Sequence, residues 1–321
     1  YARVDSISDL WLSRYGQLVI VKVLVFAVLM LLAVKIRTHL TTKANLAGFL
    51  VTEVSIMAIA IGVGVALHST PMSRAVAPLN SAAEEILGFA FPPPPSLQTV
   101  ILGWHPEWFM LSLSLVAASM YTLGVLRLRR NNVTWSVLRT ISFMVGVGLV
   151  IWTTSAGIST YSQVSFEYHM IQHMVLSMIA PIFIVLSTPI TLALRALPAQ
   201  KSKDHRSTRE WLLAALHSRY SKLITHPLMV LGIFTFGLYA LYFTPLFATL
   251  MASHTGHVFM EIHFFISGLL FSYVVIGADP GPRVVPYWSR LMIVLVGLSL
   301  HAFFAIAIMQ ASEPIGVDWY I

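Results

Sequence analysis

The sequence predicts an all-α protein, a polytopic bundle of about eight transmembrane helices. Of its 321 residues 57% are hydrophobic and only 10% are charged, and the mean hydropathy of +0.79 is far too high for a water-soluble domain. Long apolar runs recur along the chain without the polar–apolar alternation that marks strands. Because a helix satisfies its backbone hydrogen bonds internally, we expect these runs to cross the bilayer as helices.

Two of the predicted spans precede a proline-rich segment and six follow it. Each is long enough to cross about 30 Å of hydrocarbon as a helix. In chain order the predicted spans are 17–36, 48–67, 107–126, 138–158, 169–194, 228–250, 257–277 and 289–311.

The positions of the basic residues predict the orientation. Most of the 20 lysines and arginines lie in or beside four alternate loops, near 37–47, 127–138, 195–226 and 278–289. Loops rich in lysine and arginine remain in the cytoplasm. We therefore expect a multi-pass protein of the plasma membrane, with both ends of this chain on the outer side.

A proline run indicates how the chain is divided. Residues 91–95 read FPPPP, a stiff stretch that cannot continue a helix. We interpret 72–103 as an outer linker between a two-helix part, 1–71, and a six-helix part, 104–321. Since no initiator methionine or signal peptide is visible at the start, we also expect the chain to begin inside a longer protein.

The fifth loop contains an amphipathic segment, 204–222. Trp211, Leu212, Ala215 and Leu216 lie on one side of it and basic residues on the other. This pattern predicts an interfacial helix on the anionic cytoplasmic leaflet.

Composition also excludes several functions. The net charge of +7 comes from the loops between apolar spans, as membrane topology produces, so we expect no nucleic-acid binding. Without cysteine, any metal must be held by histidine, methionine, carboxylate or backbone oxygen. No phosphate-binding loop, zinc-protease motif or serine-hydrolase motif is convincing, and we expect a protein that is not an enzyme.

The first candidate metal ligands are His169 and His173, in the stretch FEYHMIQHMVLSMIAP at the outer end of the fifth span. Four residues apart, they lie about 40° from each other on a helix, so both imidazoles could bind one ion. The alternative is two interfacial histidines that bond to water or to neighbouring backbone.

A second cluster opens the seventh span, in SHTGHVFMEIHFF. His254, His257 and Glu261 lie within about 60° of one another, whereas His263 points elsewhere on the helix. A carboxylate one turn inside a span is costly unless it binds a cation, holds a ligating imidazole or pairs with a base. The cluster therefore predicts a metal-related site; the alternative is that Glu261 pairs with an imidazole and holds helices together.

Two further features carry a weaker indication. His301 lies near the middle of the last span, where it could be a deep metal ligand, a haem ligand or an interhelical hydrogen-bond partner. Met170, Met174 and Met178 form a stripe of thioethers that suit Cu(I). This stripe lies roughly 100° around the helix from the histidine face, and packing is the favoured interpretation.

Residues from about 104 to 312 resemble the caa3-type CtaG family of cytochrome c oxidase assembly proteins. The resemblance rests on motifs whose order and spacing fit: Tyr121 and Gly124, HMIQHMVLSMIAP with Pro189 after it, His226-Pro227, EIHFFISGLLF, Asp279-Pro280 and Arg290. Residues 13–71 look like the last two helices of a CopD copper-resistance domain, on Tyr15-Gly16, Lys22 and Glu53. The arrangement is similar to CopD–CtaG fusions of actinobacteria.

The resemblance implies copper handling in the assembly of haem–copper oxidase, with oxidase subunits as partners. The metal ligands that the resemblance implies are His169, His173, His257 and His263, with His254, Glu261 and His301 as further candidates. The leading hypothesis is a membrane protein that binds copper at its outer face and passes it to an oxidase subunit. One alternative is a copper transporter or channel, supported by Glu261, His263 and His301 lying progressively within spans; another is a haem-binding electron carrier.

Overall fold

The computed structural model describes residues 87, 89, 91–198 and 207–311, which belong to one compact unit, Ala83–Ile321. The predicted spans 17–36 and 48–67, and with them the CopD-like part, lie outside the described residues.

The described residues form helices and no strand, so the all-α prediction is confirmed. The helices are α5 (Leu97–Leu102), α6 (Trp108–Arg130), α7 (Val137–Ser155), α8 (Gly157–Ser162), α9 (Phe166–Met174), the π-helix η1 (Val175–Ile179), α10 (Ala180–Leu186), α11 (Pro189–Ala196), α12 (Thr208–Leu216), α13 (Arg219–Ile224), α14 (Pro227–Tyr242), α15 (Leu246–Met251), α16 (His254–Ile276) and α17 (Tyr287–Met309).

Within the described part of the chain, five helices are long and apolar enough to cross a membrane, which supports a multi-pass membrane protein. They are α6, α7, the segment Phe166–Ala196 that comprises α9 to α11, α16 and α17. The predicted span 228–250 differs, because α14 ends at Tyr242 and α15 follows as a separate short helix. Pro245 accounts for the break, since proline lacks the N–H that a continuing helix needs. The predicted count of eight is not confirmed.

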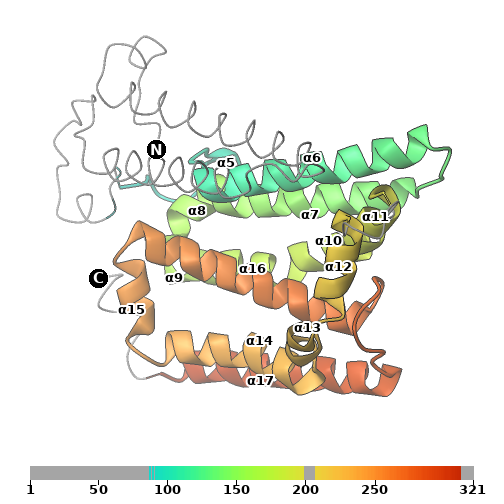
Figure 1. The fold of residues 1–321 in the computed structure, drawn as a ribbon. Helices are drawn as coiled ribbons and strands as arrows, with labels where there is room; N and C mark the ends of the chain where they lie inside the picture. The colour runs from blue at the N-terminus through green and yellow to red at the C-terminus, as the bar shows by residue number, and fades with distance from the viewer. Residues whose placement is uncertain (1–86, 88, 90, 199–206, 312–321) are drawn as a thin grey trace, which may run out of the picture. The chain divides into compact units, whose positions relative to one another are not determined.

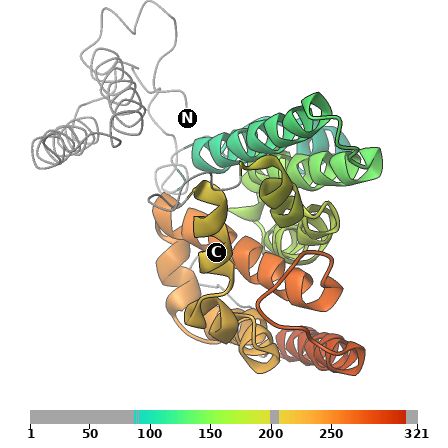
Figure 2. The same ribbon diagram turned by 45° about the vertical axis from the view of Figure 1, so that its right-hand side comes forward.

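The helices pack in three layers (Figures 1 and 2). α6 lies beside α7 on one side, α14 lies beside α17 on the other, and α16 and the α9–α10 segment lie between the two pairs. α10 contacts both α7 and α16, and η1 contacts both as well. The stretch HMIQHMVLSMIAP therefore occupies the centre of the bundle.

The helix predicted at 138–158 ends earlier, at Ser155. Ala156 is extended and forms an isolated bridge with Trp104, after which α8 begins at Gly157. A Cβ atom at Gly157 would collide with the carbonyl oxygen of Thr99. The chain can leave α7 here because Gly157 lets α5 approach its backbone closely.

The described part of the predicted linker packs against the same corner. Residues 91–95 form no helix, but the Tyr161 hydroxyl donates to the Pro93 carbonyl at 2.8 Å. The Trp152 indole N–H also donates to the Ile101 carbonyl, at 3.3 Å. These bonds hold this end of the segment on α7 and α8.

The interfacial segment was predicted as one helix over 204–222, of which 204–206 lie outside the described residues. The structure instead divides it into α12 and α13, with a break at His217-Ser218. The Ser218 hydroxyl accepts a hydrogen bond from Ser221 N and so caps a new helix. The prediction of a single helix was wrong for this reason.

Candidate metal centre

The central feature of the site is a pair of imidazoles on α9. His169 and His173 are buried, with exposed fractions of 0% and 3%, and their Nε2 atoms are 2.8 Å apart. At this distance one ring donates and the other accepts a hydrogen bond. The same spacing would let one ion lie about 2 Å from both nitrogens. The structure thus brings the two side chains together as their i, i+4 spacing indicated.

Aromatic side chains surround this histidine pair. The Phe264 ring centroid lies 3.9 Å from that of His173, and the Phe247 centroid lies 5.1 Å from that of His169. The Nδ1 atom of His173 is buried and has no hydrogen-bond partner. Such an atom in apolar surroundings favours a bound cation or an ordered water as its missing partner.

The third imidazole comes from α16. The His257 ring is buried, and its centroid lies 6.0 Å from that of His169. Its Nδ1 faces Glu261 Oε1 at 3.7 Å, whereas its Nε2 is buried without a hydrogen-bond partner. A carboxylate beside Nδ1 favours the proton on that nitrogen and leaves the lone pair on Nε2 available to an ion.

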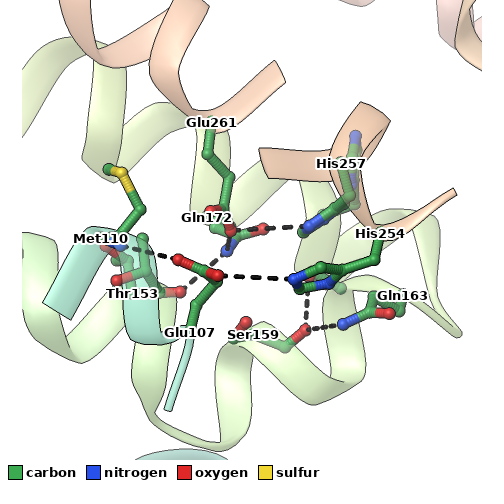
Figure 3. A network of polar contacts seen from close by, with 12 residues as sticks. Glu107, Met110, Thr153, Ser159, Gln163, Gln172, His254, His257 and Glu261 are labelled. Carbon is green, nitrogen blue, oxygen red and sulfur yellow. Dashed lines mark hydrogen bonds and ion pairs between the residues drawn. The ribbon is translucent and has the colours of Figure 1, made fainter. Parts of the chain in front are cut away.

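Glu261 is placed as a support of this histidine and not as a partner of the histidine pair. Its side chain is 1% exposed, and its Oε1 accepts a 2.7 Å hydrogen bond from Gln172 Nε2. The same amide donates to the Thr153 carbonyl at 2.8 Å (Figure 3). Sequence reasoning missed Gln172, although a polar residue between two candidate ligands in an apolar span was an available signal.

His254 lies beside His257, at the exposed edge of this group (Figure 3). Its side chain is 67% exposed, and its Nε2 is 3.4 Å from Glu107 Oε1 at the start of α6 (Figure 3). Burial would raise the pKa of Glu107, but the hydrogen bonds from His254 and from Met110 N–H outweigh it and hold that pKa below its ordinary value. The first turn of α16 therefore contacts α6 through His254. The next turn carries His257, which lies near His169 of the histidine pair.

His263 and His301 also lie outside the group of three imidazoles. His263 packs against α14 at Gly237, where a Cβ atom would collide with its Nε2. His301 lies on α17, where its Nδ1 is 3.0 Å from the Gly297 carbonyl and its ring centroid is 4.8 Å from that of Phe234. The side chains considered for a transport path thus have separate neighbours.

Among the residues that the structure describes, no three histidine or acidic side chains already stand close enough to hold one ion. The arrangement offers two imidazole nitrogens at ligand spacing and a third ring that would have to move toward them. A site of this kind can take up and give back an ion more readily than a closed four-ligand site, because its third ligand is not fixed.

The site and the basic residues lie at different ends of the bundle. α9 and the first turns of α16 lie at the end that includes α5, α8 and α15, and α11 to α13 lie at the other (Figure 1). Arg283, in the loop after α16, donates to the Lys222 carbonyl at 3.1 Å, which joins two of the basic segments.

The sequence from residue 119 to residue 321 matches the family model described as cytochrome c oxidase caa3 assembly factor, Caa3_CtaG. The chain belongs to this family. All seven candidate site residues lie inside the matched region.

The chain is also similar to uncharacterized proteins of Mycobacterium bovis, Mycobacterium tuberculosis and Mycobacterium leprae. The identity is 38%, 38% and 37% over 240 residues, which cover 75% of this chain and 36% of each relative. The chain thus spans about a third of the length of these curated relatives. No solved structure matches it. The CopD-like assignment of residues 13–71 stays a prediction.

Proposed function

We propose that this Caa3_CtaG protein binds copper at His169, His173 and His257 and supplies it to cytochrome c oxidase during assembly, without acting as an enzyme. The observation that carries the proposal is the buried histidine pair, whose Nε2 atoms are 2.8 Å apart. Membership of an oxidase assembly family indicates copper as the ion that the pair would bind, since a haem–copper oxidase must acquire copper during its assembly.

The donor set fits copper in a chain without cysteine. Imidazole nitrogen suits copper, zinc, iron and nickel, and at a given nitrogen site Cu(II) binds more tightly than the other divalent ions. Glu261 Oε1 accepts from Gln172 and faces His257 Nδ1, whereas its Oε2 is buried without a hydrogen-bond partner. Glu261 acts as a positioning residue that holds the His257 ring with Nε2 free.

The end of the bundle that carries the site is proposed to face the outside of the plasma membrane. The described arginines and lysines gather at the other end, on the last turn of α6, on α11 to α13 and in the loop after α16. The positive-inside tendency puts that end in the cytoplasm. Copper would then be received and released at the outer face, beside the partner oxidase subunits.

Metal analysis of purified protein tests the proposal. The wild type is expected to retain copper, and His169→Ala/His173→Ala is expected to lose most of it. His217→Ala is the matched control, because His217 is exposed and its Nδ1 is 2.9 Å from the Leu213 carbonyl of its own helix. Equal copper in the wild type and the double variant would reject this site.

Two measurements separate the alternatives. A Soret band with stoichiometric haem in the purified protein would replace copper delivery with haem binding. Copper uptake into liposomes that contain the protein would replace delivery with transport. In cells that lack the gene, the wild type is expected to restore copper-loaded oxidase and the double variant is not.

A further inference from the structure

A cavity of about 210 Å³ lies behind the histidine pair, between α9, η1, α14, α16 and α17. Its wall is mainly aromatic and aliphatic, from Phe234, Phe264 and Phe304 among others. His173 lines it, so the cavity begins at one of the two imidazoles of the proposed copper site. The wall also includes histidine and methionine side chains, and their nitrogen and sulfur atoms determine which ligand the cavity could bind.

One wall carries two thioethers next to His173. Met170 and Met174 both line the cavity, and Met174 is 41% exposed. They belong to a three-residue stripe, but the third member, Met178, does not line the cavity. Two of the three methionines that the sequence assigned to packing therefore share a space with His173.

The α17 side of the cavity carries an imidazole whose tautomer the structure fixes. His301 Nδ1 lies 3.0 Å from the Gly297 carbonyl oxygen, and a carbonyl can only accept. The proton therefore lies on Nδ1, and Nε2 carries the lone pair. His301 lines the cavity from α17, whereas Met170 and Met174 line it from α9.

These donors and this surrounding favour a soft, singly charged metal ion. Thioether sulfur selects Cu(I) over Cu(II) and zinc, and imidazole accepts it as well. An apolar wall adds to the preference, because the cost of removing an ion from water rises with the square of its charge.

We propose that this cavity is a second copper station, selective for Cu(I), with Met170, Met174 and His301 as its ligands. The proposal rests on the proposed function in that the cargo is copper. His173 borders both stations, so an ion could pass between the cavity and the histidine pair without entering bulk lipid. Met309 also lines the cavity, but it is 85% exposed on the last turn of α17 and is not one of the proposed ligands.

X-ray absorption of the purified full chain, loaded with Cu(I) under reducing conditions, tests the proposal. The wild type is expected to show sulfur among the copper neighbours. Met170→Leu/Met174→Leu is expected to lose that sulfur signal and to lower Cu(I) affinity on the order of tenfold or more, with Cu(II) affinity unchanged. Leucine is close to methionine in volume, so the variant should keep its fold.

Met178→Leu is the matched control, because it removes a thioether of the same stripe outside the cavity. It is expected to keep both the sulfur signal and the Cu(I) affinity. His301→Phe should weaken Cu(I) binding while the sulfur signal persists at high copper. A wild type without sulfur neighbours, or a sulfur signal that survives Met170→Leu/Met174→Leu, would overturn the proposal.

The outcomes separate the two copper proposals. If His169→Ala/His173→Ala keeps its copper and its sulfur signal while the methionine variant loses both, the histidine site is rejected and the cavity site stands. If the wild type binds copper through nitrogen alone and the histidine variant loses it, the reverse holds.

Discussion

Gln172 on α9 donates a 2.7 Å hydrogen bond to Glu261 on α16, and the same amide nitrogen donates to the Thr153 carbonyl on α7 at 2.8 Å. One side chain thus joins α9 to both α7 and α16. It stands immediately before His173 in the sequence and beside the carboxyl that faces His257. The position of both candidate ligand helices depends on this amide.

Replacement of Gln172 by methionine should therefore destabilise the protein. The variant keeps the side-chain volume but leaves Glu261 Oε1 and the Thr153 carbonyl without this donor in a buried place, at a cost of about 1–3 kcal/mol. The thermal midpoint in detergent is expected to fall. Gln310→Met, on an exposed residue, is the control and should leave the midpoint unchanged.

The double variant Gln172→Met/Glu261→Leu gives a second check. Removal of both partners is expected to restore part of the lost stability, since two apolar groups leave no buried carboxyl unpaired. Losses that simply add would show that the amide and the carboxyl do not interact.

The sequence predicted which residues share one face of a helix. It predicted less well which other helix that face contacts. The i, i+4 spacing of His169 and His173 was sufficient to place both Nε2 atoms together, because that geometry lies within one helix. His254 and His301 could not be placed in the same way. Apart from their histidines and Glu261, α16 and α17 are mainly apolar around the helix, so periodicity does not reveal which face meets which neighbour. The contacts with Glu107 and Phe234 set the positions of His254 and His301.

The breaks in the helices were also hidden. Ala156 leaves α7 because α5 packs on Gly157, a contact between segments about 55 residues apart that no local pattern shows. The π-helix η1 has an ordinary apolar sequence, VLSMI, and its wider turn lies against Gly268 of α16. Tertiary packing, and not propensity, sets both features.

Gly268 is expected to tolerate no side chain. A Cβ atom there would collide with the backbone of Ser177, so Gly268→Ala should separate α16 from η1 and cost roughly 1–3 kcal/mol. Gly148→Ala is the control, since a Cβ atom at that helical position meets nothing within 4 Å. The control should be neutral or stabilise by up to about 1 kcal/mol. Equal unfolding midpoints for the two variants would show that the helices are not in backbone contact.

Asp279 should stabilise the end of the bundle remote from the histidines. Its carboxylate accepts from Ile190 N at 3.1 Å, from Thr191 N at 2.8 Å and from the Thr191 hydroxyl at 2.6 Å, so it caps α11 from the loop after α16. Asp279→Ala is expected to lower stability by roughly 2 kcal/mol, and Thr191→Val, which keeps both N–H bonds, by less. Copper bound per folded protein should stay the same in both variants. A loss of copper would show that the Asp279 contacts at one end of the bundle affect the histidine site at the other.

Single cysteines test the orientation in a chain that has none of its own. Val284 is 96% exposed in the loop after α16, and Leu97 is 82% exposed on α5. In intact cells an impermeant thiol reagent is expected to label Leu97→Cys but to reach Val284→Cys only after permeabilisation. The opposite result would invert the proposed topology and put the histidine pair on the cytoplasmic side.

The proposed copper site makes its sharpest prediction across two helices. His169 lies on α9 and His257 on α16, with ring centroids 6.0 Å apart, so they bind one ion only if the His257 ring closes on the pair. His169→Ala and His257→Ala should then each lose most of the copper affinity, and the double variant should lose little more, because groups that act as a unit are strongly non-additive. Glu261→Gln should give a smaller loss, on the order of tenfold, because it weakens the hold on His257 without removing a ligand. Copper affinity measured by competition with a chromophoric chelator, with His217→Ala as control, decides the matter. Losses that add in the double variant would place the two histidines in separate sites, and the buried pair on α9 would then bind without the third ring.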